Sequence, residues 1–313
     1  MRIVFLGTGE FARASLRALV GASLRPALVV TPPPRRRARD APPEPTAVHA
    51  EADAAGLIVL TPEDVHEPAT LARIAASAPD LLVVADYGKI LQPTLLSLPR
   101  FGAFNVHASL LPRHRGATPI QAAILAGDAE TGVTIQRMVK RLDAGPILAQ
   151  RAIPISDDDD AGSLLARLAP LGGDLVAEVC RELAAGRLPP ERVQDESASS
   201  RSRRLDAEAC TIDWSAPAAD VWRRVRACSP KPGARTWLLR EEAMPLGVRA
   251  TRPAEGEGAA GQVVDLPGDA IAVACGRGVL LVSEVRPESR RFLTAREFLN
   301  GYRLRIGERF GRP

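Results

Sequence analysis

Short apolar runs alternate with amphipathic stretches along the first part of the chain. Residues 81–85, Leu-Leu-Val-Val-Ala, are wholly apolar and predict a buried strand. The same reasoning predicts strands at 2–6, 27–30, 57–60 and 102–106, and helices at 10–20, 47–55 and 67–77. Such an alternation is typical of an α/β, Rossmann-like fold, with a mostly parallel sheet and helices on both faces.

The pattern changes in the second part of the chain. Residues 160–185 predict one long helix with Gly172 and Gly173 as a weak point, and residues 187–206 are rich in Pro, Ser and Arg without periodicity. After them come one expected helix and four short strands divided by Gly and Pro, at 218–228, 248–250, 261–264, 270–274 and 279–285. These strands favour a small OB-like β-barrel, a fold that often contacts RNA. We therefore expect a first domain at 1–188, a linker at 189–206 and an OB-like domain at 207–313.

Composition excludes several classes of protein. With 46% hydrophobic and 25% charged residues, the 313-residue chain is typical of a globular protein, and no apolar run approaches the roughly 20 residues of a membrane helix. Its four cysteines are scattered without a C-x-x-C pair, which argues against a zinc site and fits the reducing cytoplasm. No coiled-coil or apolar interface stripe points beyond a monomer. Residues 201–313 carry 20 Lys and Arg against 14 Asp and Glu, a balance that suits a polyanionic partner.

The glycine-rich turn after the first strand fits two interpretations. Gly7-Thr-Gly9-Glu-Phe-Ala12 matches G-x-G-x-x-[GA] between a strand and a helix, the pattern of dinucleotide-binding folds. An NAD site would also need an acid about 20 residues further on, but the chain there reads Thr-Pro-Pro-Pro-Arg-Arg-Arg, with no acid before Asp40. Arginines could suit the 2′-phosphate of NADP, so an NADP-dependent oxidoreductase is one alternative. The other is that the glycines only permit a tight turn.

A second set of residues suits acyl-transfer chemistry. Asn105 and His107 lie two apart at the end of an expected strand, so both side chains face the edge of the sheet where α/β folds bind ligands. Asp143 follows the next strand in a turn and could approach His107. An amide can stabilise an oxyanion, a histidine can carry a proton, and a carboxylate can orient the imidazole ring. Spacing alone leaves open that Asn105 caps a turn and that His107 is merely hydrogen-bonded.

These segments resemble the folate-dependent formyltransferase family, and within it the enzymes that formylate methionyl-tRNA. The most specific block is 105–121, Asn-Val-His-Ala-Ser-Leu-Leu-Pro-Arg-His-Arg-Gly-Ala-Thr-Pro-Ile-Gln. The other matching stretches follow in the family's order over nearly the whole chain, at 7–12, 84–91, 126–135, 142–145, 212–214, 230–234 and 298–301.

The resemblance implies a function and a set of site residues. Asn105, His107 and Asp143 would be catalytic, the donor would be 10-formyltetrahydrofolate, and the acceptor would be the amine of methionine on initiator tRNA, for translation initiation. No metal is implied. The residues that would line the folate site are Asp86, Tyr87, Gly88, Ile90, Ser109, Leu110, Leu111 and Pro112.

The acceptor is not fixed by the catalytic triplet, because relatives with the same triplet formylate other amines, including amino sugars linked to nucleotides. The loop 31–48 matches the length of the family's tRNA-gripping insertion, and we expect its Arg35, Arg36, Arg37 and Arg39 to contact tRNA phosphates. A solvated basic loop is the alternative, and a non-catalytic RNA-binding module is a further one.

Three departures from the family pattern stand out. Ala41 and Pro42 occupy the positions of a usual lysine pair, His114 replaces a usual aromatic residue, and Lys231 replaces a common tryptophan. We interpret His114 as a structural substitution rather than a second base.

Overall fold

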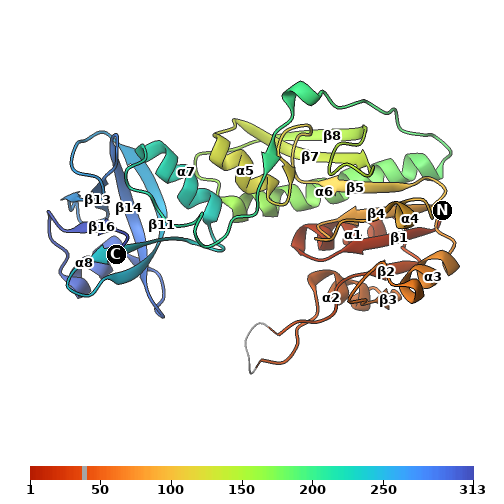
Figure 1. The fold of residues 1–313 in the computed structure, drawn as a ribbon, viewed down its shortest axis with the longest axis horizontal. Coiled ribbons are helices and arrows are strands. Elements are labelled where there is room, and N and C mark those ends of the chain that lie inside the picture. The colour runs from red at the N-terminus through yellow and green to blue at the C-terminus, as the bar shows by residue number, and fades with distance from the viewer. Residues whose placement is uncertain (37–40) are drawn as a thin grey trace. The chain divides into compact units, whose positions relative to one another are not determined.

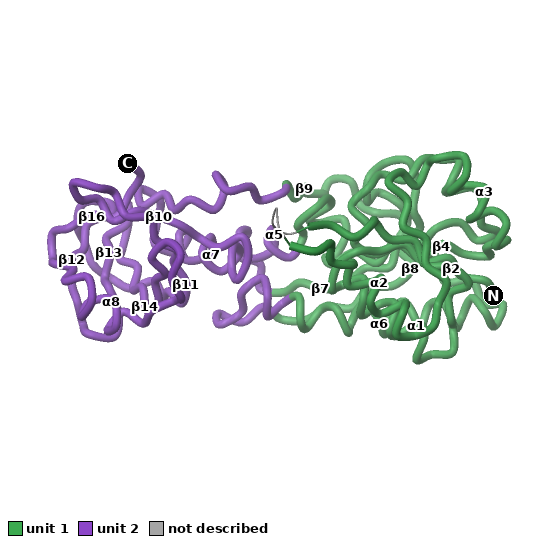
Figure 2. Tube along the Cα trace, turned by 90° about the horizontal axis from the view of Figure 1, so that it is seen from below, with its two compact units in different colours: residues 1–119, 130–154, 165–203 green, residues 120–129, 155–164, 204–313 purple. Residues whose placement is uncertain are grey.

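The computed structural model describes residues 1–36 and 41–313 and divides into two compact units. Unit 1 comprises residues 1–119, 130–154 and 165–203, and unit 2 comprises residues 120–129, 155–164 and 204–313 (Figure 2). The chain thus leaves unit 1 twice before residue 165 and returns to it each time.

Unit 1 is built on a seven-stranded sheet with the order β3-β2-β1-β4-β5-β7-β8 (Figure 1). The first five strands in this order pair in parallel, and β7 and β8 add an antiparallel edge. The strands are β1 (Ile3–Gly7), β2 (Leu28–Val30), β3 (Val59–Leu60), β4 (Leu81–Ala85), β5 (Ala103–His107), β7 (Glu130–Arg137) and β8 (Ile147–Pro154). The helices that pack on it are α1 (Glu10–Gly21), α2 (Ala47–Ala54), α3 (Pro68–Ala76), α4 (Pro93–Leu96) and α6 (Ala161–Ala184).

Helices cover both faces of this sheet, as alternation along the strands requires. The register places Val4, Leu82 and Ala103 side by side, and these residues form an apolar cluster with residues of α3 and α4. The strand residues that alternate with these face α1 and α6 on the other side of the sheet. There, Gly172 of α6 lies close to Val106 of β5. The predicted Rossmann-like, mostly parallel sheet is therefore confirmed.

The glycine pair of the long helix is a packing feature rather than a weak point. Helix α6 runs unbroken from Ala161 to Ala184 through Gly172 and Gly173. A Cβ on Gly173 would lie 2.8 Å from the carbonyl oxygen of Ala14 and 2.9 Å from the Cβ of Ala18. The glycine therefore lets α6 approach α1 more closely than any other residue would allow.

Gly173→Ala is expected to destabilise the protein although alanine has the higher helix propensity. The added methyl group must displace the backbone of α1, and such overpacking costs about 1–3 kcal/mol, more than the about 1 kcal/mol gained from propensity. Denaturant unfolding measures the change. Gly21→Ala is the matched control, because nothing lies within 4 Å of a Cβ there; equal stability of the two variants would contradict the packing argument.

Unit 2 contains the expected small antiparallel barrel. Its sheet has the order β12-β13-β14-β11-β10-β16, and a bridge between Gln262 and Arg309 returns β16 to the start of β12. The strands are β10 (Ala234–Leu239), β11 (Met244–Ala254), β12 (Val263–Asp265), β13 (Ile271–Ala274), β14 (Val279–Pro287), β15 (Leu293–Thr294) and β16 (Arg309–Gly311), and the helices are α5 (Pro119–Ala126), α7 (Ala218–Cys228) and α8 (Ala295–Tyr302). The barrel interior holds buried apolar residues such as Leu238, Val282 and Phe310.

The segment after α6 packs on unit 1 rather than running free to the barrel. Arg192 pairs with Ile147 of β8 through two backbone hydrogen bonds of 2.8 and 2.9 Å. Further on, β9 (Arg201–Ser202) pairs in parallel with β6 (Arg115–Gly116), and a short 3-10 helix spans Glu196–Ala198. These contacts bring part of the residues 189–206 next to the block that begins at Asn105.

Candidate active site

The three predicted catalytic residues, Asn105, His107 and Asp143, lie close together near the end of β5 in unit 1. Asn105 pairs with Gln136 and His107 with Thr134 across the β5–β7 ladder, so these four side chains share one face of the sheet. Asp143 lies in the turn between β7 and β8, in a left-handed conformation with φ of 48°. The turn folds Asp143 back toward β5, as the sequence predicted.

The carboxylate of Asp143 is the centre of the hydrogen-bond network. Its Oδ1 accepts from Gln136 Nε2 at 3.0 Å and from Asn105 Nδ2 at 3.4 Å. Its Oδ2 accepts from the backbone N–H of Gly116 at 2.9 Å and lies 3.9 Å from Nδ1 of His107. Three donors therefore fix a carboxylate whose side chain is only 9% exposed.

The two ring nitrogens of His107 have different partners. Nε2 lies 3.1 Å from the carbonyl oxygen of His114. A carbonyl oxygen can only accept, so Nε2 carries a proton in this arrangement. Nδ1 faces Asp143, and it is consequently the ring nitrogen that is left to gain or lose a proton.

Residues 109–112 form a tightly held turn beside this triplet. The Thr134 hydroxyl donates to Ser109 O at 2.7 Å and accepts from Leu111 N at 3.1 Å, while the Ser109 hydroxyl donates to Arg113 O at 2.7 Å. The side chains of Ser109 and Leu111 are buried, whereas Leu110 is partly exposed. Pro112 is also partly exposed, so Leu110, Pro112 and backbone groups are the parts of this stretch that a ligand can reach.

The other stretch predicted for folate, residues 86–90, follows β4. Ile90 is 78% exposed, while Tyr87 is buried and its hydroxyl has no hydrogen-bond partner among the described residues. Burial, with the nearby charge of Asp64 as second cause, raises the pKa of Tyr87 to about 12. Partial loss of solvent raises the pKa of Asp86, and a hydrogen bond from the backbone of Gly9 opposes this shift. The loop thus offers an apolar side chain and a carboxylate at the same end of the sheet as Asn105.

The glycine-rich turn is explained by packing. A Cβ on Gly7 would lie 2.7 Å from the Cβ of Ala12, and one on Gly9 would lie 2.3 Å from Oδ2 of Asp86. Both glycines are required by their neighbours within unit 1, so the pattern needs no dinucleotide to account for it.

The basic loop is described only in part. Arg35 pairs through its backbone with Glu44, with hydrogen bonds of 3.1 and 3.0 Å, and the side chains of Arg35 and Arg36 are exposed. Arg37 and Arg39 lie outside the described residues.

Sequence reasoning missed three polar residues of the network. Gln136, Gln194 and Arg115 are each at most 5% exposed and hydrogen-bond around the turn that carries Asp143. The two-residue alternation of β7 could have placed Gln136 beside Thr134, but nothing in the pattern of residues 189–206 indicates that Gln194 folds back onto this turn.

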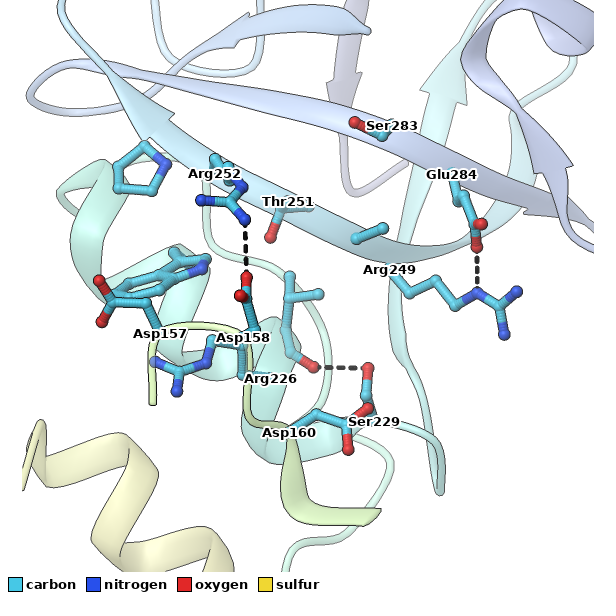
Figure 3. Close-up of a pocket in the computed structure, with 14 residues that line it drawn as sticks. Asp157, Asp158, Asp160, Arg226, Ser229, Arg249, Thr251, Arg252, Ser283 and Glu284 are labelled. Atoms are coloured by element: carbon cyan, nitrogen blue, oxygen red, sulfur yellow. Dashed lines mark hydrogen bonds and ion pairs between the residues drawn. The ribbon is translucent and has the colours of Figure 1, made fainter. Parts of the chain in front are cut away.

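A separate cavity of about 750 Å³ is formed wholly by unit 2 (Figure 3). Arg252 pairs with Asp158 at 2.6 Å, and Arg249 pairs with Glu284. These two arginines are thus paired with acids, while the third, Arg226, donates to the backbone carbonyls of Asp159 and Ser156. None of the catalytic or folate residues predicted from the sequence lines the cavity.

Neither a membrane span nor a metal-ligand cluster is found in the part of the chain that the structure describes. No helix there is long and apolar enough to cross a membrane. No group of three or more His, Cys, Asp or Glu side chains is placed to hold a metal ion within residues 1–36 and 41–313.

Comparisons with known proteins show the family of the chain. The sequence model of the family described as formyl transferase matches residues 1–180, and that of the formyl transferase C-terminal domain matches residues 204–303. The chain is 43% identical over 311 residues to a methionyl-tRNA formyltransferase of Methylococcus capsulatus, covering 99% of this chain and 100% of the relative. It is 45% identical to a methionyl-tRNA formyltransferase of an Anaeromyxobacter species, covering 97% of each.

Solved structures share the fold. HypX from Aquifex aeolicus, crystallised with tetrahydrofolic acid, superposes with a TM-score of 0.63 at 21% identity, over 96% of this chain and 48% of that one. The identity is too low to carry more than the architecture, but the family matches and the full-length relatives carry the assignment. The chain belongs to the formyl transferase family, in its methionyl-tRNA formyltransferase branch.

Proposed function

We infer that the protein transfers the formyl group of 10-formyltetrahydrofolate to the amino group of methionine on initiator tRNA, the modification used to initiate translation. The observation that carries this function is the grouping of Asn105, His107 and Asp143 at one end of β5, in a chain 40–45% identical over nearly its full length to methionyl-tRNA formyltransferases. We propose that it acts in the cytoplasm, as a monomer.

The transfer forms one carbon–nitrogen bond and breaks another. The amine nitrogen bonds to the formyl carbon, the bond from that carbon to the folate nitrogen breaks, and a proton passes from the amine to the leaving nitrogen. A tetrahedral centre with a negatively charged oxygen lies between the two steps, so the site must stabilise that oxygen and move that proton.

Asn105 suits the first task. Its amide has two N–H groups, and its bond to Asp143 is long, at 3.4 Å. The second N–H can therefore donate to the oxygen of the tetrahedral centre, where a preorganised donor is most effective.

His107 suits the second task. Nε2 is occupied by His114 O, so Nδ1 accepts the proton from the amine and later returns it to the leaving nitrogen. Asp143 faces Nδ1 and stabilises the positive charge that the ring then carries. Asp143 keeps its own position through the bonds from Gly116 and Gln136.

The same end of the sheet can hold the folate. Residues of the 86–90 loop and of the 109–112 turn border it, and the exposed Ile90 can cover the face of the flat pterin ring while Asp86 and backbone groups hydrogen-bond to the heteroatoms at its edge. We propose Asp86, Tyr87, Gly88, Ile90, Ser109, Leu110, Leu111 and Pro112 as the lining, with the buried Ser109 and Leu111 shaping the turn from within.

The acceptor is proposed from the relatives' names and from charge. The exposed Arg35 and Arg36 begin the basic loop, and Arg37 and Arg39 continue it in the sequence. Guanidinium groups suit phosphates, and the basic residues of 201–313 add a second surface for a polyanion. We accordingly propose residues 1–188 as the catalytic domain, 189–206 as the linker and 207–313 as the tRNA-binding domain, a division that the family matches at 1–180 and 204–303 support.

A comparison of two acceptor substrates tests the function. Formyl transfer from 10-formyltetrahydrofolate is measured with initiator Met-tRNA and, separately, with a nucleotide-linked amino sugar. We expect transfer to the tRNA alone. If the protein instead formylates the sugar and does not bind tRNA at low salt, it is a formyltransferase for nucleotide-linked amino sugars.

The double variant Arg35→Ala/Arg39→Ala is expected to raise KM for tRNA by about tenfold or more. Each lost phosphate contact also lowers the slope of log affinity against log salt by about 0.7–0.9. Binding of formyl folate, followed by fluorescence, should not change. A KM for tRNA equal to that of the wild type would show that this loop does not grip the acceptor.

A further inference from the structure

The turn that carries Asp143 needs support from outside its own hairpin. Asp143 adopts the left-handed conformation, with φ of 48°, which is uncommon for residues other than glycine, although aspartate tolerates it better than most. Two residues later, Gly145 packs so closely that a Cβ would lie 1.7 Å from the carbonyl oxygen of Arg137. The β7–β8 register is also irregular here, between Ile135 and Gln136. Such a backbone keeps its shape only when its surroundings hold it.

Gln194 supplies that support from the segment that follows α6. Gln194 is only 5% exposed, and its Nε2 donates to Asp143 O at 2.9 Å and to Gly145 O at 2.7 Å. A longer contact of 3.4 Å reaches Oε1 of Gln136, whose own amide holds the Asp143 carboxylate. Both amide hydrogens of Gln194 are thus directed at the turn.

Arg115 fixes the orientation of the Gln194 amide. Nε and Nη2 of Arg115 lie 3.1 and 2.7 Å from Oε1 of Gln194. Because a guanidinium only donates, the oxygen of the amide must face Arg115 and the NH2 group must face the two carbonyls. Glu196 in turn holds Arg115 at 2.9 Å, and this bond lowers the pKa of Glu196, which stays charged at neutral pH.

Strand β6, which carries Arg115, also contacts Asp143 directly. Gly116, the residue after Arg115, donates its backbone N–H to Oδ2 of Asp143 at 2.9 Å. Backbone and carboxylate of Asp143 are therefore tied to two adjacent residues, one directly and one through Gln194. A shift of the turn would move the carboxylate relative to His107, which it faces at 3.9 Å.

We propose that Gln194 is a positioning residue for formyl transfer, which holds the Asp143 turn in its catalytic geometry through an amide oriented by Arg115. The proposal rests on the role of Asp143 in the proposed function. It gives the stretch 189–206, otherwise a connection between domains, a part in the chemistry of unit 1.

Gln194→Ala is expected to lower kcat about 10- to 100-fold, the range for misplacing a catalytic group by roughly an ångström. KM for formyl folate and for tRNA should stay within about twofold, because Gln194 contacts neither proposed binding stretch. Val193→Ala is the matched control, since the neighbouring Val193 side chain is 84% exposed.

A second variant, Gln194→Glu, tests the proposal even if Gln194→Ala does not fold. It keeps the volume of the side chain and an oxygen for Arg115, but replaces the donating NH2 group by an acceptor that faces two carbonyl oxygens. We expect a folded protein, by thermal melting, with kcat lowered at least as much as in Gln194→Ala. Wild-type kcat in both variants would overturn the proposal.

The double variant with Asp143→Asn separates positioning from a general structural role. If Gln194 acts through Asp143, adding Gln194→Ala to Asp143→Asn should lower kcat by less than about threefold further. Multiplication of the two single losses would overturn the proposal and leave the function intact. Wild-type kcat in Asp143→Asn alone would instead refute the proposed role of Asp143, so the two failures are distinguishable.

Discussion

Asp143→Asn is expected to lower kcat by about 10²- to 10⁴-fold while the protein folds normally. The carboxylate accepts from Gly116 N, Gln136 Nε2 and Asn105 Nδ2, at 2.9, 3.0 and 3.4 Å. An amide in its place must turn an NH2 group toward at least one of these donors. It also lacks the negative charge that stabilises a protonated His107, so both the geometry and the electrostatics of proton transfer suffer.

Single-turnover formyl transfer, with tRNA and folate saturating, measures this loss without a contribution from product release. Asp174→Asn is the matched control, because Asp174 is an exposed residue of α6 outside the site. The substitution is nearly isosteric, so melting temperature should change little in the control and moderately in Asp143→Asn. A rate within threefold of wild type would remove Asp143 from the mechanism.

The regular elements of the fold could be predicted where one physical signal dominates. The run 81–85 became β4 with the same bounds, and the expected helix at 10–20 became α1 at Glu10–Gly21. Both elements are fixed by local apolar pattern, which tertiary structure only has to accommodate.

Elements whose signals conflict were missed or shortened. Strand β11 runs from Met244 to Ala254, but Pro245 and Pro253 near its ends confined the expected strand to 248–250. Helix α8 was not expected, although Thr294 and Glu297 form a capping box around its start. Its eight residues are too few for periodicity to show, so only the cap could have revealed it.

Some residues of the site could likewise be predicted from the local sequence, and others could not. Asn105 and His107 follow from the two-residue alternation of a strand, which needs no knowledge of the rest of the chain. The support of Asp143 does not follow, because Gln194 is 51 residues away and reaches the turn through a segment without periodicity. Pairings over such distances depend on the assembled fold.

The last prediction concerns the oxyanion. Asn105→Ala is expected to lower kcat by about 10²- to 10³-fold, or about 2.7–4 kcal/mol of transition-state stabilisation, the loss typical of a deleted oxyanion donor. KM for folate and tRNA should change little, because the charge that the amide stabilises exists only in the tetrahedral state. Asn300→Ala is the matched control, at the only other asparagine of the chain, which is exposed on α8.

Folding cannot account for the expected loss in Asn105→Ala. The side chain contributes one long hydrogen bond of 3.4 Å, to Asp143, whose carboxylate keeps its bonds from Gly116 and Gln136. The variant should therefore retain folate binding and a nearly unchanged melting temperature. A higher KM with unchanged kcat would instead show that Asn105 contributes to ground-state binding. Unchanged kinetics would mean that the oxygen of the tetrahedral centre is stabilised by other groups, and Asn105 would then serve only to hold Asp143.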